Sequence, residues 1–399
     1  MTGPQGISRR DVLLASAAVG AGVAVGYVAD GVVEWSNTDE EPRGEFEAVL
    51  YVPAGSVTDI RAALDALGTT PGQVVLGPGR VDDVTDSIVV PSNTWLRGTG
   101  RGATTLAFAD AAAPELAGLL RVTGARVLVS DLALDGNRAE VPLSEGNSGR
   151  EYGIYTSGAQ DVTLSRVACR NFAGYGIDPH ADGGRASEGV VVTDCLAENN
   201  GFDGITLAGV SGGIVRDCVS RDNDRHGLAV TDHEATGVSL VGNVSRGNGA
   251  SGVVVQNRAT GATIGSNVIA ANDRDGVRIG SGEGPSAGVV VANNVIRDNG
   301  LYGVNVRLST EITVTGNRVA DNGYVGNVTA AVVLQDDGSR FSGDVVITGN
   351  QIRVADGVAH GVEERPGNGP TAVGLNVFQT AGDAAVRTTH EDSIAQLNI

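Results

Sequence analysis

Short apolar segments recur along most of the chain, and each begins at an aliphatic residue that follows a glycine or an alanine. These steps are Gly153-Ile154, Gly176-Ile177, Gly204-Ile205, Gly227-Leu228, Gly252-Val253, Gly276-Val277, Gly303-Val304 and Ala331-Val332. Successive steps are separated by 23, 28, 23, 25, 24, 27 and 28 residues. A period of this length, with short strands and no helix between them, is typical of one coil of a parallel β-helix. The pattern therefore predicts an all-β solenoid.

Within each segment, apolar and polar positions alternate, and the alternation assigns the two faces of the predicted strand. The residues one and three positions after the glycine are mostly apolar, as in Ile177 and Pro179, and we expect them to point inward. The residues two and four positions after it, such as Asp178 and His180, should face solvent along one side of the stack.

Two sets of asparagines recur at fixed offsets from these segments and mark corners of the coil. The first set is Asn200, Asn223, Asn248, Asn272 and Asn299, and the second is Asn243, Asn267, Asn294, Asn317 and Asn350. Asparagine tolerates the left-handed turn conformation, and its amide can hydrogen-bond to the equivalent residue of the next coil. We interpret both sets as structural and not as ligands.

The two ends of the repeat region differ from its middle. Ser56 and Asp59 have the form of a capping box, and Gly68 is a suitable C-cap. Between them Ile60, Ala63, Leu64 and Leu67 share one helical face, which predicts a short helix that covers the first coil. Past about residue 357 the pattern decays. The predicted domains are an acidic linker over 36–48, a β-helix over 49–360 and a C-terminal cap or tail over 361–399.

Residues 1–35 are predicted to be a targeting segment. Ser8-Arg9-Arg10-Asp11 resembles the twin-arginine export motif, and a mildly apolar run follows it from Val12 to Val28. Asp30 and Glu34 end the run before the ~20 residues that a membrane span needs. Export to the medium or the cell surface is the prediction, with a retained N-terminal anchor as the alternative because no clear cleavage site is visible.

Composition supports stacked strands and restricts the partners. Aromatic residues make up only 4% of the chain and there are 59 glycines, which suits narrow interior layers and tight turns. The formal charge is −19 and all 28 basic residues are arginines, so the chain lacks the basic surface that nucleic-acid binding requires. Cys169, Cys195 and Cys218 form no metal-binding pattern, and we expect them to be small buried core residues.

Tyr175, Asp178 and His180 place a phenol, a carboxylate and an imidazole within six residues. Asp178 and His180 share a face, Tyr175 lies just across Gly176, and equivalent residues of neighbouring coils should lie about 4.8 Å apart. Such convergence predicts a site for proton transfer. Two coils on, Arg225 and His226 are either part of the same groove or a solvated corner.

Four stretches closely resemble the catalytic module of secreted bacterial mannuronan C5-epimerases. They are Ser130-Asp131-Leu132-Ala133-Leu134-Asp135-Gly136-Asn137-Arg138, Tyr175-Gly176-Ile177-Asp178-Pro179-His180, Asn223-Asp224-Arg225-His226-Gly227 and Ser251-Gly252-Val253-Val254-Val255-Gln256. The resemblance implies a right-handed parallel β-helix in which Tyr175 and His180 exchange protons with a sugar. It also implies that Asp178 supports the site and that Arg225 and His226 lie along the binding groove.

The chain departs from this family in two places. An acidic residue of the family is replaced by Ala208, which the coil register places beside His180, and the family's lysine ahead of the motif has no counterpart. Arg150 is the candidate to supply the missing charge. The loop from Ala181 to Glu188 is longer than in the family and is expected to carry Arg185 back toward the site. Gln256, Arg278 and Arg307 are further predicted groove residues for substrate binding.

The sequence thus predicts a polyuronate C5-epimerase that converts β-D-mannuronosyl to α-L-guluronosyl residues, or performs the equivalent inversion, in an exported acidic polysaccharide. The chemistry requires removal of a C5 proton once the carboxylate charge is neutralised, followed by reprotonation from the opposite face. A lyase acting by β-elimination at the same site and a carbohydrate-binding β-helix without activity are the alternatives. The assignment of base and acid between Tyr175 and His180 stays open. We predict a monomer without a bound transition metal; no cofactor is firmly indicated, and calcium is kept as a possibility.

Overall fold

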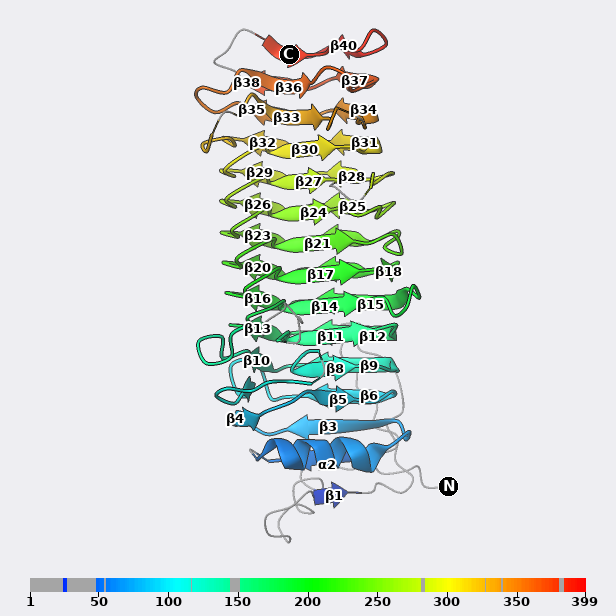
Figure 1. The fold of residues 1–399 in the computed structure, drawn as a ribbon, viewed down its shortest axis with the longest axis vertical. Helices are drawn as coiled ribbons and strands as arrows, with labels where there is room; N and C mark the ends of the chain where they lie inside the picture. Colours follow the sequence, from blue (N-terminus) through cyan, green and yellow to red (C-terminus); the bar gives the residue numbers. More distant parts are fainter. Residues whose placement is uncertain are drawn as a thin grey trace, which may run out of the picture.

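The computed structural model describes residues 24–26, 48–53, 55–115, 117–143, 151–280, 284–326, 328–338, 340–379 and 384–399. Over these ranges the chain winds into a parallel β-helix, an elongated stack whose coils contribute strands to three sheets (Figure 1). The fold predicted from the repeat is confirmed. We name the sheets A, B and C.

Each sheet runs along the length of the stack and takes one strand from nearly every coil. Sheet A contains β1 (Ala24–Gly26), β2 (Ala48–Val52), β3 (Gly72–Leu76), β6 (Thr94–Arg97), β9 (Ala125–Ser130), β12 (Gln160–Ser165), β15 (Ser187–Thr193), β18 (Val210–Ser211), β19 (Ile214–Arg216), β22 (Ser239–Val241), β25 (Thr263–Gly265), β28 (Val290–Ala292), β31 (Thr310–Thr315), β34 (Gly343–Thr348), β37 (Thr371–Gly374) and β40 (Ile394–Gln396). Sheet B contains β4 (Gly79–Val84), β7 (Thr104–Phe108), β10 (Ala133–Asp135), β13 (Ala168–Arg170), β16 (Leu196–Glu198), β20 (Val219–Arg221), β23 (Val244–Arg246), β26 (Val268–Ala270), β29 (Val295–Arg297), β32 (Arg318–Ala320), β35 (Gln351–Arg353) and β38 (Val377–Gln379). Sheet C contains β5 (Ile88–Val90), β8 (Leu120–Val122), β11 (Ile154–Ser157), β14 (Ile177–His180), β17 (Ile205–Ala208), β21 (Leu228–Thr231), β24 (Val253–Val255), β27 (Val277–Ile279), β30 (Val304–Arg307), β33 (Ala330–Gln335), β36 (His360–Glu364) and β39 (Ala384–Arg387).

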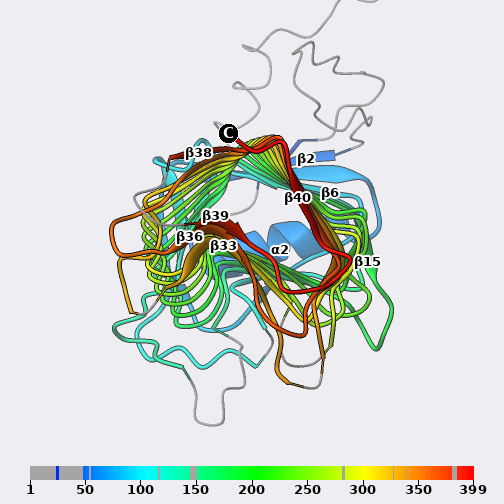
Figure 2. The same ribbon diagram turned by 90° about the horizontal axis from the view of Figure 1, so that it is seen from above.

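The three sheets enclose one continuous apolar interior, which Figure 2 shows along the axis of the stack. In sheet C the first inward position of successive strands pairs in register, and its residues are at most 1% exposed: Ile154, Ile177, Ile205, Leu228 and Val253. Because side chains alternate along a strand, this register fixes which residues point outward. The prediction of which strand residues point inward and which point outward is therefore confirmed.

The predicted capping helix is present as α2 (Val57–Leu67), which lies across the N-terminal end of the stack (Figure 1). Its first turn is held by acidic side chains: the Ser56 amide donates to Asp59 Oδ2 at 3.3 Å, and the Val57 amide donates to Asp83 Oδ1 at 3.0 Å. Ile60, Ala63, Leu64 and Leu67 are all buried, as predicted. The helix thus covers apolar surface that the first coil would otherwise expose.

Both predicted asparagine sets form ladders of side-chain hydrogen bonds along the corners. In the first ladder each amide nitrogen lies 2.8–2.9 Å from the next side-chain oxygen, over Asn200, Asn223, Asn248, Asn272, Asn299 and Asn322. The second ladder has distances of 2.9–3.1 Å over Asn243, Asn267, Asn294, Asn317, Asn350, Asn376 and Asn398. Both ladders extend one or more coils beyond the predicted members.

The C-terminal boundary that we predicted is wrong. Strands β36, β37, β38, β39 and β40 pair in parallel with the preceding coils, so the stack continues through Gln396 and 361–399 is not a separate tail. The repeat is harder to see there because an alanine, Ala331, replaces the glycine and the next step lies thirty residues on at Gly361. His360, the last residue of the predicted β-helix domain, begins β36.

The N-terminal predictions fall largely outside the described residues. Within residues 1–35 only β1 is described, and it pairs antiparallel with β2; the rest of that segment and the acidic linker up to residue 47 lie outside. Among the described helices, none has the length and apolar character to cross a membrane. The three cysteines are free and buried, as predicted.

Candidate active site

The predicted catalytic residues lie on one coil of sheet C. Strand β14 carries Asp178 and His180 and lies between β11 and β17, with Tyr175 just before its first residue. The register pairs Ser157 with His180 and His180 with Ala208. The predicted position of Ala208 beside His180 is confirmed, so no carboxylate occupies that place.

The Tyr175 ring is held in an aromatic cluster. It meets the Tyr152 ring edge-on at 4.9 Å between centroids and the Phe202 ring at 5.2 Å. The Tyr175 hydroxyl accepts a hydrogen bond of 2.9 Å from Arg225 Nη2. Burial raises the pKa of the phenol, although the Arg225 charge acts in the opposite direction. The phenol therefore keeps its proton at neutral pH and has a cation in place to stabilise the phenolate.

Arg225 is anchored beside the Tyr175 hydroxyl, and its side chain remains 39% exposed. Its guanidinium binds both oxygens of Asp203, with Nε to Oδ1 at 2.6 Å and Nη2 to Oδ2 at 2.7 Å. Asp203 is 1% exposed and also accepts from the His226 amide at 2.9 Å and the Thr206 hydroxyl at 3.2 Å. A buried ion pair needs such additional hydrogen bonds to offset the cost of desolvation. Arg225 thus acts on Tyr175 from a fixed position.

Asp178 points outward but is not exposed, which corrects the expectation that it faces solvent. It is only 3% exposed, and its Oδ1 is buried without a hydrogen-bond partner among the described residues. The phenols of Tyr152, Tyr155 and Tyr175 all lie close enough for the Asp178 charge to raise their pKa values. Burial, and then the negative charge of Asp203, raises the pKa of Asp178 well above its usual range. Its carboxyl group is therefore stabilised in the neutral form.

His180 is half-buried, and its ring stacks on the Tyr155 ring with centroids 5.7 Å apart. Nδ1 lies 3.0 Å from the backbone oxygen of Ala181. Because a carbonyl only accepts hydrogen bonds, this contact assigns the proton of the neutral ring to Nδ1. Nε2 then carries a lone pair and can act as a base.

His226 has the opposite tautomer. Its Nδ1 accepts a hydrogen bond of 3.1 Å from the Ser251 amide, so the ring proton is assigned to Nε2. The side chain is 5% exposed, and burial lowers its pKa to about 4. His226 is therefore a neutral donor at neutral pH, while His180 is an acceptor.

Arg278, another predicted groove residue, lies between His226 and a further one, Gln256. Arg278 Nη2 lies 3.4 Å from His226 Nε2 and donates to Gln256 Oε1 at 3.0 Å. Arg278 is outward on β27, next to β24 in sheet C. The structure therefore brings His226, Gln256 and Arg278 together on the C-terminal side of the predicted catalytic coil.

The remaining predicted residues are spread out. Arg307 is exposed at the end of β30. Arg185 is exposed in a turn closed by backbone hydrogen bonds with Asp182 of 2.9 and 2.8 Å, and no described side-chain contact joins Arg185 to the catalytic coil. Arg150 lies outside the described residues. The structure thus does not bring Arg185 to the site, because the turn folds back on itself.

The comparisons with known proteins assign the fold family. The family model for the right handed beta helix region matches residues 134–260 and 233–395. The chain belongs to this right-handed β-helix family. Mannuronan C5-epimerase AlgE5 of Azotobacter vinelandii is 29% identical in an alignment over 355 residues that covers 77% of this chain and 32% of AlgE5. Alginate lyase 7 of the same organism is 30% identical over 189 residues, covering 43% of this chain and 21% of the lyase.

Among solved structures, the A-module of Azotobacter vinelandii mannuronan C-5 epimerase AlgE6 matches this right-handed β-helix with a TM-score of 0.76. The two are 27% identical, and the match covers 86% of this chain and 94% of the A-module. The chain spans about a third of the length of AlgE5 but nearly all of the AlgE6 A-module.

Sequence reasoning missed several residues that shape this part of the β-helix. Asp203, which orients Arg225, was not among the predicted site residues. A pattern in the sequence identifies it, since the residue before each glycine step forms its own column: Tyr152, Tyr175, Asp203, His226, Ser251, Asp275 and Tyr302. Phe202 and Arg121, whose guanidinium lies 5.3 Å from the Tyr155 ring centroid, were missed because their roles depend on side-chain reach between coils.

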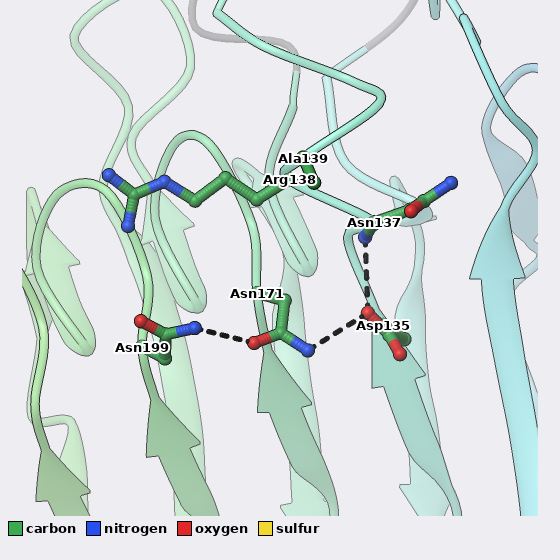
Figure 3. A pocket seen from close by; sticks show the side chains of 6 residues that line it. All are labelled: Asp135, Asn137, Arg138, Ala139, Asn171 and Asn199. Carbon is green, nitrogen blue, oxygen red and sulfur yellow. Dashed lines mark hydrogen bonds between the residues drawn. The ribbon is translucent and has the colours of Figure 1, made fainter.

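An open cavity lies elsewhere on the β-helix, beyond the ends of β10, β13 and β16 (Figure 3). Its volume is about 500 Å³, and its lining consists of Asp135, Asn137, Arg138, Ala139, Asn171 and Asn199. Asn199 donates to Asn171 at 2.7 Å, and Asn171 donates to Asp135 at 3.2 Å. These polar groups satisfy one another, and none of Tyr175, Asp178 and His180 lines the cavity. It is therefore separate from the candidate active site.

Proposed function

We propose that this protein is a polyuronate C5-epimerase that converts β-D-mannuronosyl to α-L-guluronosyl residues in an exported acidic polysaccharide. One observation carries the proposal: a protonated phenol and an unprotonated imidazole nitrogen lie on the same coil, in a β-helix that matches the AlgE6 A-module over most of its length. Inversion at C5 requires such a pair, one group to remove the proton and one to return it.

The protonation states support His180 as the base and Tyr175 as the acid. Nε2 of His180 takes the C5 proton, which leaves an enolate-like intermediate and an imidazolium. The Tyr175 hydroxyl then donates its proton to the opposite face of C5, and the inverted sugar is released. Arg225 stabilises the resulting phenolate through its hydrogen bond of 2.9 Å. Return of the proton from His180 to Tyr175 through solvent resets the site.

Asp178 supports proton removal from its buried position. A uronate carboxylate makes the neighbouring C5 proton less acidic until its charge is reduced. Because the Asp178 carboxyl is stabilised in its neutral form, it can donate a hydrogen bond to that carboxylate, whereas an ionised carboxylate would repel it. This role also explains why Oδ1 has no hydrogen-bond partner within the described part of the protein.

The test is to incubate the purified protein with polymannuronate in deuterated water. We expect deuterium at C5 and guluronate signals in the product spectrum. If neither exchange at C5 nor unsaturated chain ends appear, every enzymatic version of the proposal fails.

Lyase activity is the second candidate, and the similarity to alginate lyase 7 favours testing it. The same intermediate can expel the C4 oxygen instead of taking up a proton at C5, which leaves an unsaturated end that absorbs in the ultraviolet. A third reading is binding without catalysis, motivated by Ala208 beside His180. In that case His180→Ala would leave polysaccharide binding unchanged, and the wild-type protein would show no turnover.

We also propose export by the twin-arginine route and a monomeric state. Arg9→Lys combined with Arg10→Lys should retain the protein in the cytoplasm, which cell fractionation would show; light scattering would establish the mass in solution. Calcium stays an untested proposal. Within the described ranges no group of three or more His, Cys, Asp or Glu is placed to hold a metal, so the mechanism above uses none. A chelator that abolishes turnover would show that the requirement exists.

A further inference from the structure

A second stretch of sheet C repeats the pattern of the predicted catalytic coil. Tyr302-Gly303-Val304-Asn305-Val306-Arg307 has the same spacing as Tyr175-Gly176-Ile177-Asp178-Pro179-His180. We call these stretches the distal coil and the reactive coil. Strand pairing along sheet C carries the register from β14 to β30, so that Asn305 lies in the column of Asp178 and Arg307 in the column of His180. Five strand-to-strand steps separate the two coils, a distance of about 24 Å.

The distal coil has polar atoms that lack partners. Asn305 is 6% exposed, and its Oδ1 is buried without a hydrogen-bond partner in the part of the chain that the structure describes. Arg278 pairs directly with Asn305 in the strand register, and its Nε is likewise buried without a partner. An unsatisfied buried polar atom costs about 1–3 kcal/mol, so such atoms call for an explanation. An acceptor and a donor on adjacent strands fit a ligand that carries both hydroxyl and acidic groups.

The distal coil also presents a cation where the reactive coil presents a base. Arg307 is exposed at the end of β30. A guanidinium can bind a carboxylate through its N–H donors, but it offers no lone pair to remove a proton from carbon. Tyr302 is 8% exposed, and its hydroxyl is held by Arg365 Nη2 at 2.8 Å. The coil therefore has the features of a binding site and lacks those of a proton-transfer site.

We propose that the distal coil is a second uronate-binding subsite, in which Arg307 binds a carboxylate and Asn305 Oδ1 accepts a hydrogen bond from a sugar hydroxyl. The inference rests on the proposed function, since it takes the ligand to be the same acidic polysaccharide. Its consequence is a length requirement. A chain that occupies both coils must span about 24 Å, so a trisaccharide reaches one coil at a time and a decasaccharide reaches both.

Calorimetric titration of oligomannuronates tests this inference in a Tyr175→Phe background, where turnover does not disturb the measurement. Adding Arg307→Ala should weaken decasaccharide binding about tenfold and leave trisaccharide binding within about twofold. Asn305→Ala should weaken decasaccharide binding about fivefold with the same dependence on length. The matched control is Arg246→Ala, which removes the same charge from an exposed arginine of sheet B and should change neither affinity.

Decasaccharide affinity that is equal with and without Arg307 would overturn the inference, as would an equal loss for both lengths or no binding of the decasaccharide by the parent protein. The C5 exchange assay on wild-type protein separates this result from the fate of the proposed function. If deuterium exchanges at C5 but Arg307→Ala has no effect on affinity, the subsite is excluded and the epimerase proposal stands. If affinity falls in a length-dependent way but no exchange at C5 occurs, the epimerase proposal is excluded and a polysaccharide-binding subsite stands.

Discussion

The reactive and distal coils share a tyrosine, a glycine and an apolar inward pair, and they differ in their two outward side chains. Each has a tyrosine before the glycine, and each tyrosine hydroxyl accepts a hydrogen bond from an arginine, Arg225 at 2.9 Å and Arg365 at 2.8 Å. The strand register also puts a histidine two coils after each tyrosine, His226 and His360. The outward pair is Asp178 and His180 in one coil and Asn305 and Arg307 in the other. The β-helix thus repeats the framework, and under the proposed mechanism the two outward residues decide whether a coil can move a proton.

The arginines reach the two tyrosines from opposite directions. Arg225 precedes β21, on the side of the strand where Tyr175 lies, and its carboxylate partner Asp203 holds it there. Arg365 follows β36 and therefore reaches Tyr302 across the outward face of sheet C. Its nearest acidic group, Glu363, is 3.7 Å away and is shared with Arg387 at 3.0 Å.

The largest expected effect comes from giving the reactive coil the distal residue. His180→Arg removes the only proposed base and replaces it with a permanent cation, so kcat should fall about a thousandfold. Deuterium incorporation at C5 measures this loss. Polymer binding should persist, because the added cation attracts the polyanion. Turnover within tenfold of wild type would show that His180 is not the base; an unchanged thermal unfolding midpoint serves as the control for folding.

Removing the tyrosine hydroxyl should change a different kinetic parameter in each coil, kcat in the reactive coil and KM in the distal coil. Tyr175→Phe removes the proposed acid and should lower kcat about a hundredfold. Tyr302→Phe removes only the hydroxyl that Arg365 holds, and it should raise the KM for long polymer a few fold. Steady-state kinetics on polymannuronate distinguishes the two. An equal fall in kcat for both variants would mean that the coils do not differ in function.

Much of this comparison could be predicted from sequence, because the coil period and the alternation within a strand set the register. Those rules place Ala208 beside His180 and direct Asp178 outward, and the structure agrees with both. They do not tell which outward positions are covered. Asp178 is buried because tyrosines from its own and the preceding coil surround it, and that depends on side-chain length and rotamer, which periodicity does not encode.

Arg307 was predicted as a groove residue, but the likeness of its coil to the reactive coil was overlooked for two physical reasons. Asn305 and Arg307 carry no sign of proton chemistry, so a search for titratable clusters passes over them. Its arginine partner lies beyond residue 360, where a longer interval and Ala331 hide the repeat. Arg225 was assigned to the groove by the family resemblance; only the geometry shows that Asp203 holds its guanidinium against the Tyr175 hydroxyl. Register is thus accessible from sequence, and the pairing of long charged side chains between coils is not.

His226 is buried and its counterpart His360 is partly exposed. His226 should therefore affect how the stability of the protein depends on pH. Its pKa is about 4 in the folded protein, against 6.5 when unperturbed, because burial disfavours the charged ring. As pH falls through 6.5 the unfolded chain binds a proton that the folded chain rejects until about 4. Stability that is fully present above 6.5 is therefore lost on acidification, by on the order of 3 kcal/mol from this residue.

Urea unfolding at pH 7 and pH 4.5 measures this loss in wild-type protein and in His226→Gln. The glutamine variant should lose less stability between the two pH values, because its side chain does not titrate. If the free energy of unfolding fell equally in both proteins, His226 would be excluded as the source of the loss. The difference in burial between His226 and the partly exposed His360 would then have no effect on stability.

The smallest expected change in stability has the opposite dependence on pH and involves Asp178 and Asn305. Burial raises the pKa of Asp178, so the unfolded chain releases this proton at a lower pH than the folded chain does. Stability from this group is fully present at acid pH and declines as pH rises toward the folded pKa. Asp178→Asn gives the reactive coil the distal residue; it should abolish most turnover yet raise the free energy of unfolding at pH 8 by about 2 kcal/mol, with no gain near pH 4.

Asn305→Asp is the reciprocal control and should lose stability at pH 8, because it places a carboxylate beside the buried Asp275. If Asp178→Asn were less stable than wild type at pH 8, the carboxylate would have to be paired in the folded protein, and the neutral Asp178 of the proposed mechanism would be wrong.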